Sequence, residues 1–93
     1  MLVFESVKSL QNYLQENRTK SVGFVPTMGA LHNGHLSLIE ASQIKCDITI
    51  CSIFVNPTQF NKKEDLVKYP RNTEKDLSML KSKNCDVVFI PSV

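Results

Sequence analysis

The stretch "PTMGALHNGHLSLIEA", Pro26–Ala41, decides the fold that the sequence predicts. It opens with a turn signal of proline and glycine and ends in an apolar pattern of helical spacing, with Leu36 and Ile39 on one face. The short β-rich run "SVGFVP" leads into it. We therefore predict a strand, a turn and a helix in this part of the chain.

Regular patterns on both sides extend this alternation. Val7, Leu10 and Leu14 recur at helical spacing and predict an amphipathic helix that stops near Asn17. The almost continuously apolar, β-branched run "DITICSIFV", Asp47–Val55, predicts a central strand that is covered on both faces.

The end of the chain repeats the pattern once more. Thr73 precedes Asp76 in an arrangement like a capping box, which predicts a helix with Leu77 and Leu80 turned inward. The run "DVVFIP" then predicts a further buried strand. This succession predicts the α/β class, with a parallel sheet flanked by helices. Because an open sheet normally continues beyond such a strand, we expect a truncated, N-terminal portion of a larger domain.

Composition limits the classes of protein to consider. The 93 residues are 42% apolar, which suffices for one small globular domain or part of one. A net charge of +2 gives no reason to expect nucleic acid, and the basic residues of 62–83 are interpreted first as a solvated face. No apolar run is long enough to span a bilayer and no leader pattern is present, so we expect no membrane contact and a cytoplasmic location.

The three cysteines are Cys46, Cys51 and Cys85. Their number is odd, they show no CxxC spacing, and they fall in or beside apolar segments. Buried free thiols are therefore expected, rather than a disulfide or a metal site.

Two polar motifs follow predicted strands, at the edge where open parallel sheets gather their ligands. These are "PTMGALHNGH" and "NPTQF". Gly29 and Gly34 have the outer spacing of a phosphate-binding P-loop, but His35 and Leu36 stand where that loop needs Lys and Ser or Thr. The glycines do not satisfy the dinucleotide fingerprint GxGxxG either.

The histidines of the first motif are candidate phosphate ligands. A helix that begins near His32 directs unsatisfied amides and its positive dipole end at an anion. His32 and His35 could donate hydrogen bonds to phosphate oxygens and stabilise charge as pyrophosphate leaves. Gly34 leaves room for a base or ribose close to the backbone. Surface or capping roles are the alternative, and an HxxH pair can also hold a metal, although no suitably spaced further ligand follows.

The second motif places Asn56 and Gln59 just beyond a strand end. Their amides can both donate to and accept from a small polar molecule. Turn formation and ordinary structural hydrogen bonds are the alternatives for these two residues. Arg71, in "YPR", is interpreted as a structural anchor of its loop rather than a phosphate ligand.

Four segments together closely resemble pantothenate synthetases, also called pantoate:β-alanine ligases: "VPTMGALHNGHLSLI", "SIFVNPTQF", "KYPRNTEKD" and "DVVFIPSV". HxGH alone would indicate only the superfamily of nucleotidylyltransferases and class I aminoacyl-tRNA synthetases, the HIGH type. Its combination with FVNPxQF is far more specific. The resemblance covers essentially the whole chain and corresponds to the N-terminal portion of the family.

The resemblance implies a Rossmann-like ligase that makes pantothenate, the coenzyme A precursor. Pantoate attacks the α-phosphorus of ATP to give pantoyl adenylate and pyrophosphate, and β-alanine then displaces AMP. Magnesium accompanies ATP, and the family forms homodimers.

The resemblance also implies roles for particular residues. His35 is the expected proton donor and His32 its partner on the nucleotide, and these two are the catalytic candidates. Residues of the second motif and of the preceding strand end are implied to bind pantoate and β-alanine. The ATP-binding set is Met28, Gly29, Ala30, Leu31, His32, Asn33, Gly34 and His35, and the pantoate and β-alanine set is Gln59, Asn56, Pro26 and Thr27.

Residues 1–93 would thus be the N-terminal part of a Rossmann-like domain that binds ATP and pantoate, without the C-terminal domain of the family. The segment alone is expected to lack turnover. Three alternatives stay open: another HxGH nucleotidylyltransferase, a nucleotide-binding or oligomerising fragment without turnover, and a metal-binding module formed by the histidines with Cys46.

Overall fold

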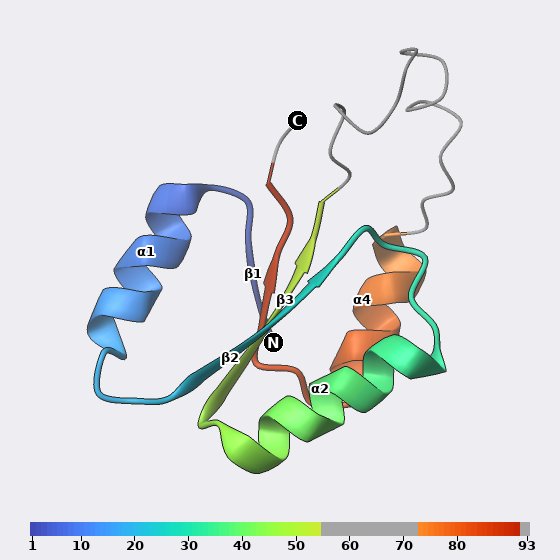
Figure 1. The fold of residues 1–93 in the computed structure, drawn as a ribbon. Coiled ribbons are helices and arrows are strands. Elements are labelled where there is room, and N and C mark those ends of the chain that lie inside the picture. The colour runs from blue at the N-terminus through green and yellow to red at the C-terminus, as the bar shows by residue number, and fades with distance from the viewer. Residues whose placement is uncertain (55–72, 92–93) are drawn as a thin grey trace.

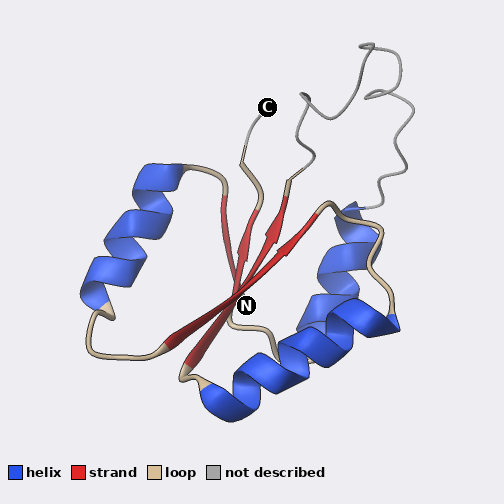
Figure 2. Cartoon of the chain, in the orientation of Figure 1, coloured by secondary structure: helices blue, strands red, loops and turns tan. Residues whose placement is uncertain are grey.

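The computed structural model describes residues 1–54 and 73–91. Within these residues four strands form one sheet in the order β1-β4-β3-β2, and every neighbouring pair is parallel. In these same residues three helices, α1, α2 and α4, each lie between two strands that follow one another in the chain, as Figure 2 shows. The elements are β1 Leu2–Phe4, α1 Val7–Glu16, β2 Val22–Thr27, α2 Asn33–Lys45, β3 Ile48–Ile53, α4 Thr73–Ser82 and β4 Val87–Phe89. The prediction of a parallel α/β sheet flanked by helices is confirmed.

The predicted central strand is β3. It lies between β4 and β2, and all six of its residues are buried. Ile50 pairs with Phe24 on one side and with Val87 on the other. A strand that is covered on both faces has no need of alternating polar residues, which explains its continuous apolar sequence.

The helices form a layer on each side of the sheet. In Figure 1, α1 covers one face, and α2 and α4 cover the other. The buried residues accordingly form two clusters. On the α2 and α4 face the cluster is Val25, Leu31, Ile39, Cys51, Ile53, Leu80, Cys85 and Val88. On the α1 face it is Ile48, Ile50 and Val87, with Phe4, Leu10, Tyr13, Leu14 and Phe89 packed against it.

Strand β2 runs through Pro26, where the sequence predicted its end. The backbone carbonyls of Ser21 and Thr27 accept hydrogen bonds from Ile48 and Phe54 beside them. Because backbone polar groups alternate in direction along a strand, Pro26 faces the opposite way, toward the edge of the described sheet. Proline has no N–H to donate, and an edge position does not require one.

Strand β1 is absent from the prediction. Its three residues join the sheet through bonds from Leu2 N to Asp86 O and from Ile90 N to Phe4 O, of 3.0 and 2.8 Å. Both partners lie more than eighty positions away in the chain, so no local pattern marks this strand.

The cysteines are free, as predicted, and two of them are buried: Cys51 and Cys85. Cys46 is only partly covered. Burial raises the pKa of the Cys51 thiol to about 12, so this thiol stays protonated at neutral pH. Among the described residues, no helix has the length and apolar character to cross a membrane.

Candidate functional site

The candidate site begins at the carboxyl ends of β2 and β3, which lie side by side. Thr27 pairs with Ile53 in the register of the two strands, and its Oγ1 donates to the carbonyl of Ser52 at 2.9 Å. The same Oγ1 accepts a bond of 3.2 Å from Gly29 N. Thr27 was predicted to bind pantoate and β-alanine. Its hydroxyl joins the two strand ends to the turn that follows.

That turn has an unusual backbone. Gly29 has φ of +88° and Ala30 has φ of +52°, so two consecutive residues occupy the left-handed region. Glycine is the residue that adopts this region without a steric penalty, whereas an alanine there needs support from its surroundings. The turn passes from β2 to α2 in five residues, Met28 to His32.

Asp76 supplies the support. Its carboxylate accepts from Ala30 N at 3.1 Å and from Leu31 N at 2.9 Å. The predicted capping box is wrong in this respect, because Thr73 is already the first residue of α4 and the Asp76 carboxylate binds the turn. Figure 1 shows α4 alongside the turn that enters α2.

The two histidines cap the start of α2 for each other. His32 is the N-cap residue, and its Nδ1 accepts from Gly34 N at 3.0 Å. In return, His35 Nδ1 accepts from His32 N at 3.1 Å. This arrangement is a capping box in which two imidazoles take the places usually held by Ser or Thr and by Glu. The ring centroids are 4.1 Å apart.

The capping fixes which nitrogens are available to a ligand. A neutral imidazole has one acceptor nitrogen and one N–H. Because both Nδ1 atoms accept backbone bonds, each neutral ring carries its proton on Nε2. The pair thus offers two Nε2–H donors at the carboxyl edge of the sheet.

The predicted mode of anion binding differs from this geometry. The amide of Gly34 donates to the His32 ring, and the amides of His35 and Leu36 donate to the His32 carbonyl. These three amides of the first turn are already satisfied, so they are not free to bind an anion, whereas the imidazoles still carry donors. The prediction of free amides at the start of α2 is wrong for these three groups.

The environment of His35 favours its neutral form. Partial burial lowers the pKa of His35 below its ordinary value of 6.5, and the neighbouring His32 adds to this, whereas Asp76 opposes it. A neutral ring at physiological pH retains the Nδ1 lone pair that the capping box uses.

Gly34 has a different neighbour from the one predicted. A Cβ at this position would lie 2.8 Å from Cε1 and 3.0 Å from Nδ1 of His32. The absent side chain therefore makes room for the capping imidazole, and a close approach by a ligand is not needed to explain this glycine.

The other residues of the predicted ATP set fall in the same continuous segment. Met28, Ala30 and Asn33 lie on its accessible side, whereas Leu31 is 7% exposed and packs in the core. The Leu31 side chain is thus unavailable to a ligand. Asn56, Gln59 and Arg71 lie outside the described residues.

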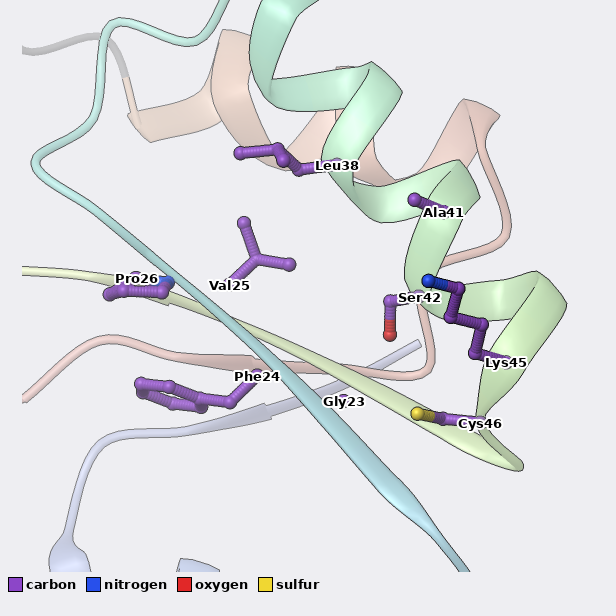
Figure 3. Close-up of a pocket in the computed structure, with 9 residues that line it drawn as sticks. All are labelled: Gly23, Phe24, Val25, Pro26, Leu38, Ala41, Ser42, Lys45 and Cys46. Carbon is purple, nitrogen blue, oxygen red and sulfur yellow. The ribbon is translucent and has the colours of Figure 1, made fainter.

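A pocket of about 410 Å³ lies beside this segment, between β2 and α2. Figure 3 shows Val25 pointing into it below Leu38, with Lys45 and Cys46 at the far end. Pro26 lines it, but neither histidine does. The lining is mainly apolar, and its one cation, Lys45, lies at the far end of the pocket, so the site is better defined by the histidine pair.

Sequence reasoning missed Asp76 as a residue of the site. Asp76 accepts hydrogen bonds from two backbone amides that lie 45 and 46 positions away in the chain. No pattern in the neighbouring sequence could therefore indicate them. Among the residues at 1–54 and 73–91, no group of three or more His, Cys, Asp or Glu side chains is placed to hold a metal ion.

Comparison with known proteins gives concordant results. The family model Pantoate-beta-alanine ligase matches residues 2–93. A pantothenate synthetase from Porphyromonas gingivalis is 52% identical over 95 aligned positions, which take in 100% of this chain and 34% of that protein. One from Thermosipho africanus is 55% identical over 89 positions, covering 96% of this chain and 32% of the relative.

Solved structures agree. The pantoate-beta-alanine ligase of Francisella tularensis, complexed with beta-gamma ATP and beta-alanine, superposes with a TM-score of 0.90 at 44% identity, over 99% of this chain and 36% of its own. The pantothenate synthetase of Thermus thermophilus gives a TM-score of 0.87 at 40% identity, over 99% of this chain and 32% of its own. The chain thus spans about a third of the length of these relatives.

Proposed function

The chain belongs to the pantoate-beta-alanine ligase family, and from this premise we propose that it supplies the nucleotide-binding turn and histidine pair of an enzyme that condenses pantoate with β-alanine at the expense of ATP. The observation that carries the proposal is the reciprocal capping of His32 and His35, which leaves two Nε2–H donors at the carboxyl edge of the sheet. That edge is where open α/β sheets bind ligands.

The proposed reaction has two steps. In the first, a carboxylate oxygen of pantoate bonds to the α-phosphorus of ATP, and the bond from that phosphorus to the pyrophosphate oxygen breaks. In the second, the amine of β-alanine bonds to the pantoyl carbonyl carbon, the bond to AMP breaks, and the nitrogen loses a proton. Negative charge therefore develops on the departing pyrophosphate and, later, on AMP.

The histidine pair suits the first step. A donor that is already oriented costs no reorganisation when charge develops on a phosphate oxygen. We assign the Nε2–H of His35 to the leaving pyrophosphate and that of His32 to the nucleotide phosphates. Because both rings are held through Nδ1, each presents its donor in one orientation.

Magnesium is expected to accompany ATP. The described residues do not form a protein cage for it: they contain no suitable cluster of ligands, and the Asp76 carboxylate is engaged by two amides. On the family resemblance alone, a set of four residues is proposed to bind pantoate and β-alanine: Gln59, Asn56, Pro26 and Thr27. A cytoplasmic location and a homodimer are proposed on the same ground.

Turnover is proposed to need the remainder of the family polypeptide, since the Porphyromonas gingivalis relative is matched over 34% of its length. The test is a chimera in which this chain replaces the matching third of that relative. We expect pyrophosphate release from ATP and Mg²⁺ that depends on pantoate. In this chimera, His35→Ala should lower kcat by about 10²–10³, as removal of one oriented donor does elsewhere.

Glu40→Gln is the matched control, because it changes an exposed side chain of the same helix that lies five positions beyond His35 and pairs with Lys83. Release that is independent of pantoate would favour a nucleotidylyltransferase with another acceptor. Full activity in the His35→Ala chimera would refute the assigned donor.

A further inference from the structure

Asp76 is buried to a degree that is rare for a carboxylate. It is 3% exposed, and its partners are two backbone amides of a distant turn. A buried carboxylate is expensive unless hydrogen bonds compensate it, so such a group persists where its bonds have a structural or functional purpose.

The two backbone amides that bind Asp76 have the arrangement of an anion-binding nest. Successive N–H groups of a turn with left-handed residues converge on one side of the backbone and bind anions, often phosphates, in other proteins. Here Ala30 N and Leu31 N converge on the two oxygens of Asp76. A Cβ on Gly29 would lie 3.3 Å from Oδ2, so the carboxylate fits closely against the turn.

Ala30 and Leu31, whose amides Asp76 binds, immediately precede His32 in the chain. Leu31 N is bound by Asp76, and the next amide, His32 N, donates to the His35 ring. A rotation of the backbone at Ala30 or Leu31 would therefore move His32 and break the reciprocal cap. The carboxylate is thus one peptide unit away from the geometry that sets both Nε2–H donors.

We propose that Asp76 is a positioning residue for the histidine pair: its carboxylate holds residues 29–31 in the left-handed turn that fixes the orientation of His32 and His35. The proposal rests on the proposed function for the identity of the ligand, but its structural part does not need a ligand. It also makes the placement of α4 a determinant of the site on α2.

The first experiment uses this chain and Asp76→Asn. The substitution keeps the shape, but it presents an amide NH₂ to one of the two backbone donors. We expect hydrogen exchange of the Ala30 and Leu31 amides to accelerate at least about tenfold relative to the sheet amides of Ile50 and Val87, because a buried donor loses its acceptor. The ¹⁵N signals of the two imidazoles should shift from the Nε2–H tautomer toward a mixture.

Two control variants separate positioning from general stability. Leu77→Ala loosens the packing of α4 on the core but leaves the Asp76 carboxylate in place, since Leu77 packs against the buried cluster. It should accelerate exchange in turn and sheet alike and leave the tautomers unchanged. Glu74→Gln removes an acidic charge from the same first turn of α4 at an exposed position. It should change neither the exchange rates of the turn amides nor the tautomers of the imidazoles.

The second experiment uses the chimera described above. Asp76→Asn should lower kcat by about 10–100-fold, the scale expected of a misplacement of about 1 Å, with the KM for β-alanine nearly unchanged. If the unsubstituted chimera releases no pyrophosphate while the exchange results hold, the proposed function fails and the positioning role stands.

The positioning role is overturned if Asp76→Asn leaves both the turn amides and the tautomers as they were, or if Leu77→Ala alters the tautomers as much. Should Asp76→Asn fail to fold, exchange in the unsubstituted chain decides: slow exchange of Ala30 and Leu31, comparable to that of Ile50, supports the proposal, and exchange as fast as that of exposed loop amides refutes it.

Discussion

The two faces of the sheet are covered to different depths. On the face of α2 and α4, Ile39 and Leu80 are completely buried, and α4 also buries Asp76. On the other face α1 has no buried residue, and it packs through the half-buried Leu10, Tyr13 and Leu14. The turn and the histidine pair belong to the deeply packed face. The geometry of the site therefore depends on the packing of α2 and α4 more than on that of α1.

The largest expected loss of stability comes from disrupting the core on one face of the sheet. Leu80→Ala should lower the free energy of unfolding by about 3 kcal/mol, because a fully buried leucine leaves a cavity. The counterpart Leu10→Ala on α1 should cost about 1 kcal/mol, since part of this side chain already faces solvent. Urea unfolding followed by circular dichroism measures both, and equal losses would abolish the contrast between the faces.

The next effect concerns the contact of β2 with α2. A Cβ at Gly23 would overlap Ser42 Oγ and lie 3.2 Å from Cys46 Sγ, so Gly23→Ala should cost about 1–3 kcal/mol through overpacking. Ser42 also shares a bond of 2.7 Å with Thr49 Oγ1. In a double-mutant cycle with Ser42→Ala, the two losses should sum to more than the loss in the double variant. Strict additivity would show that the predicted overlap is relieved elsewhere.

A smaller effect sharpens the comparison at the turn. Gly29→Ala should cost about 1–2 kcal/mol, because φ of +88° is unfavourable for a residue with a Cβ. Ala30→Gly, which removes a Cβ from the neighbouring left-handed position, is the control and should be close to neutral. Thermal unfolding of the pair tests this, and a neutral Gly29→Ala would contradict the described turn.

The pH dependence of stability reports on His35. Its pKa is lowered on folding, so the unfolded chain binds more protons below its ordinary pKa of 6.5. The contribution to stability is complete above 6.5 and is lost as the pH falls from there through the folded pKa. His35→Gln should remove this part of the slope in urea unfolding at several pH values. A slope of opposite sign in the unsubstituted chain would contradict the neutral, capped ring.

The smallest effect is on an exposed ion pair. Lys83 Nζ lies 2.6 Å from Glu40 Oε1, with side chains 39% and 51% exposed. Glu40→Gln should change the free energy of unfolding by no more than about 0.5 kcal/mol. A loss above about 1 kcal/mol would mean that the surface of α2 contributes as its buried face does.

How far the sequence predicted these features depends on the range of the interactions. The segment from β2 to β3 follows from local periodicity, and its bounds shift by a residue or two. Strand β1 was missed, because its partners Asp86 and Ile90 are remote. In the site, the histidines were found by motif, but their capping of each other was not, since imidazoles replace the usual side chains of a capping box. Asp76 was assigned to a capping box with Thr73, so its bonds to the distant amides of Ala30 and Leu31 were not predicted.

The central claim is that the capped histidines present Nε2–H donors to ATP. The direct measurement is a titration of this chain with ATP and Mg²⁺, observed through the ¹⁵N signals of the two imidazoles at a pH above the ordinary histidine pKa of 6.5. We predict Nε2–H tautomers for both rings in the free chain, and movement of the Nε2 signals on addition of ATP. Protonated Nδ1 atoms, or imidazole ¹⁵N signals that do not move when ATP is added to millimolar concentration, would contradict the claim.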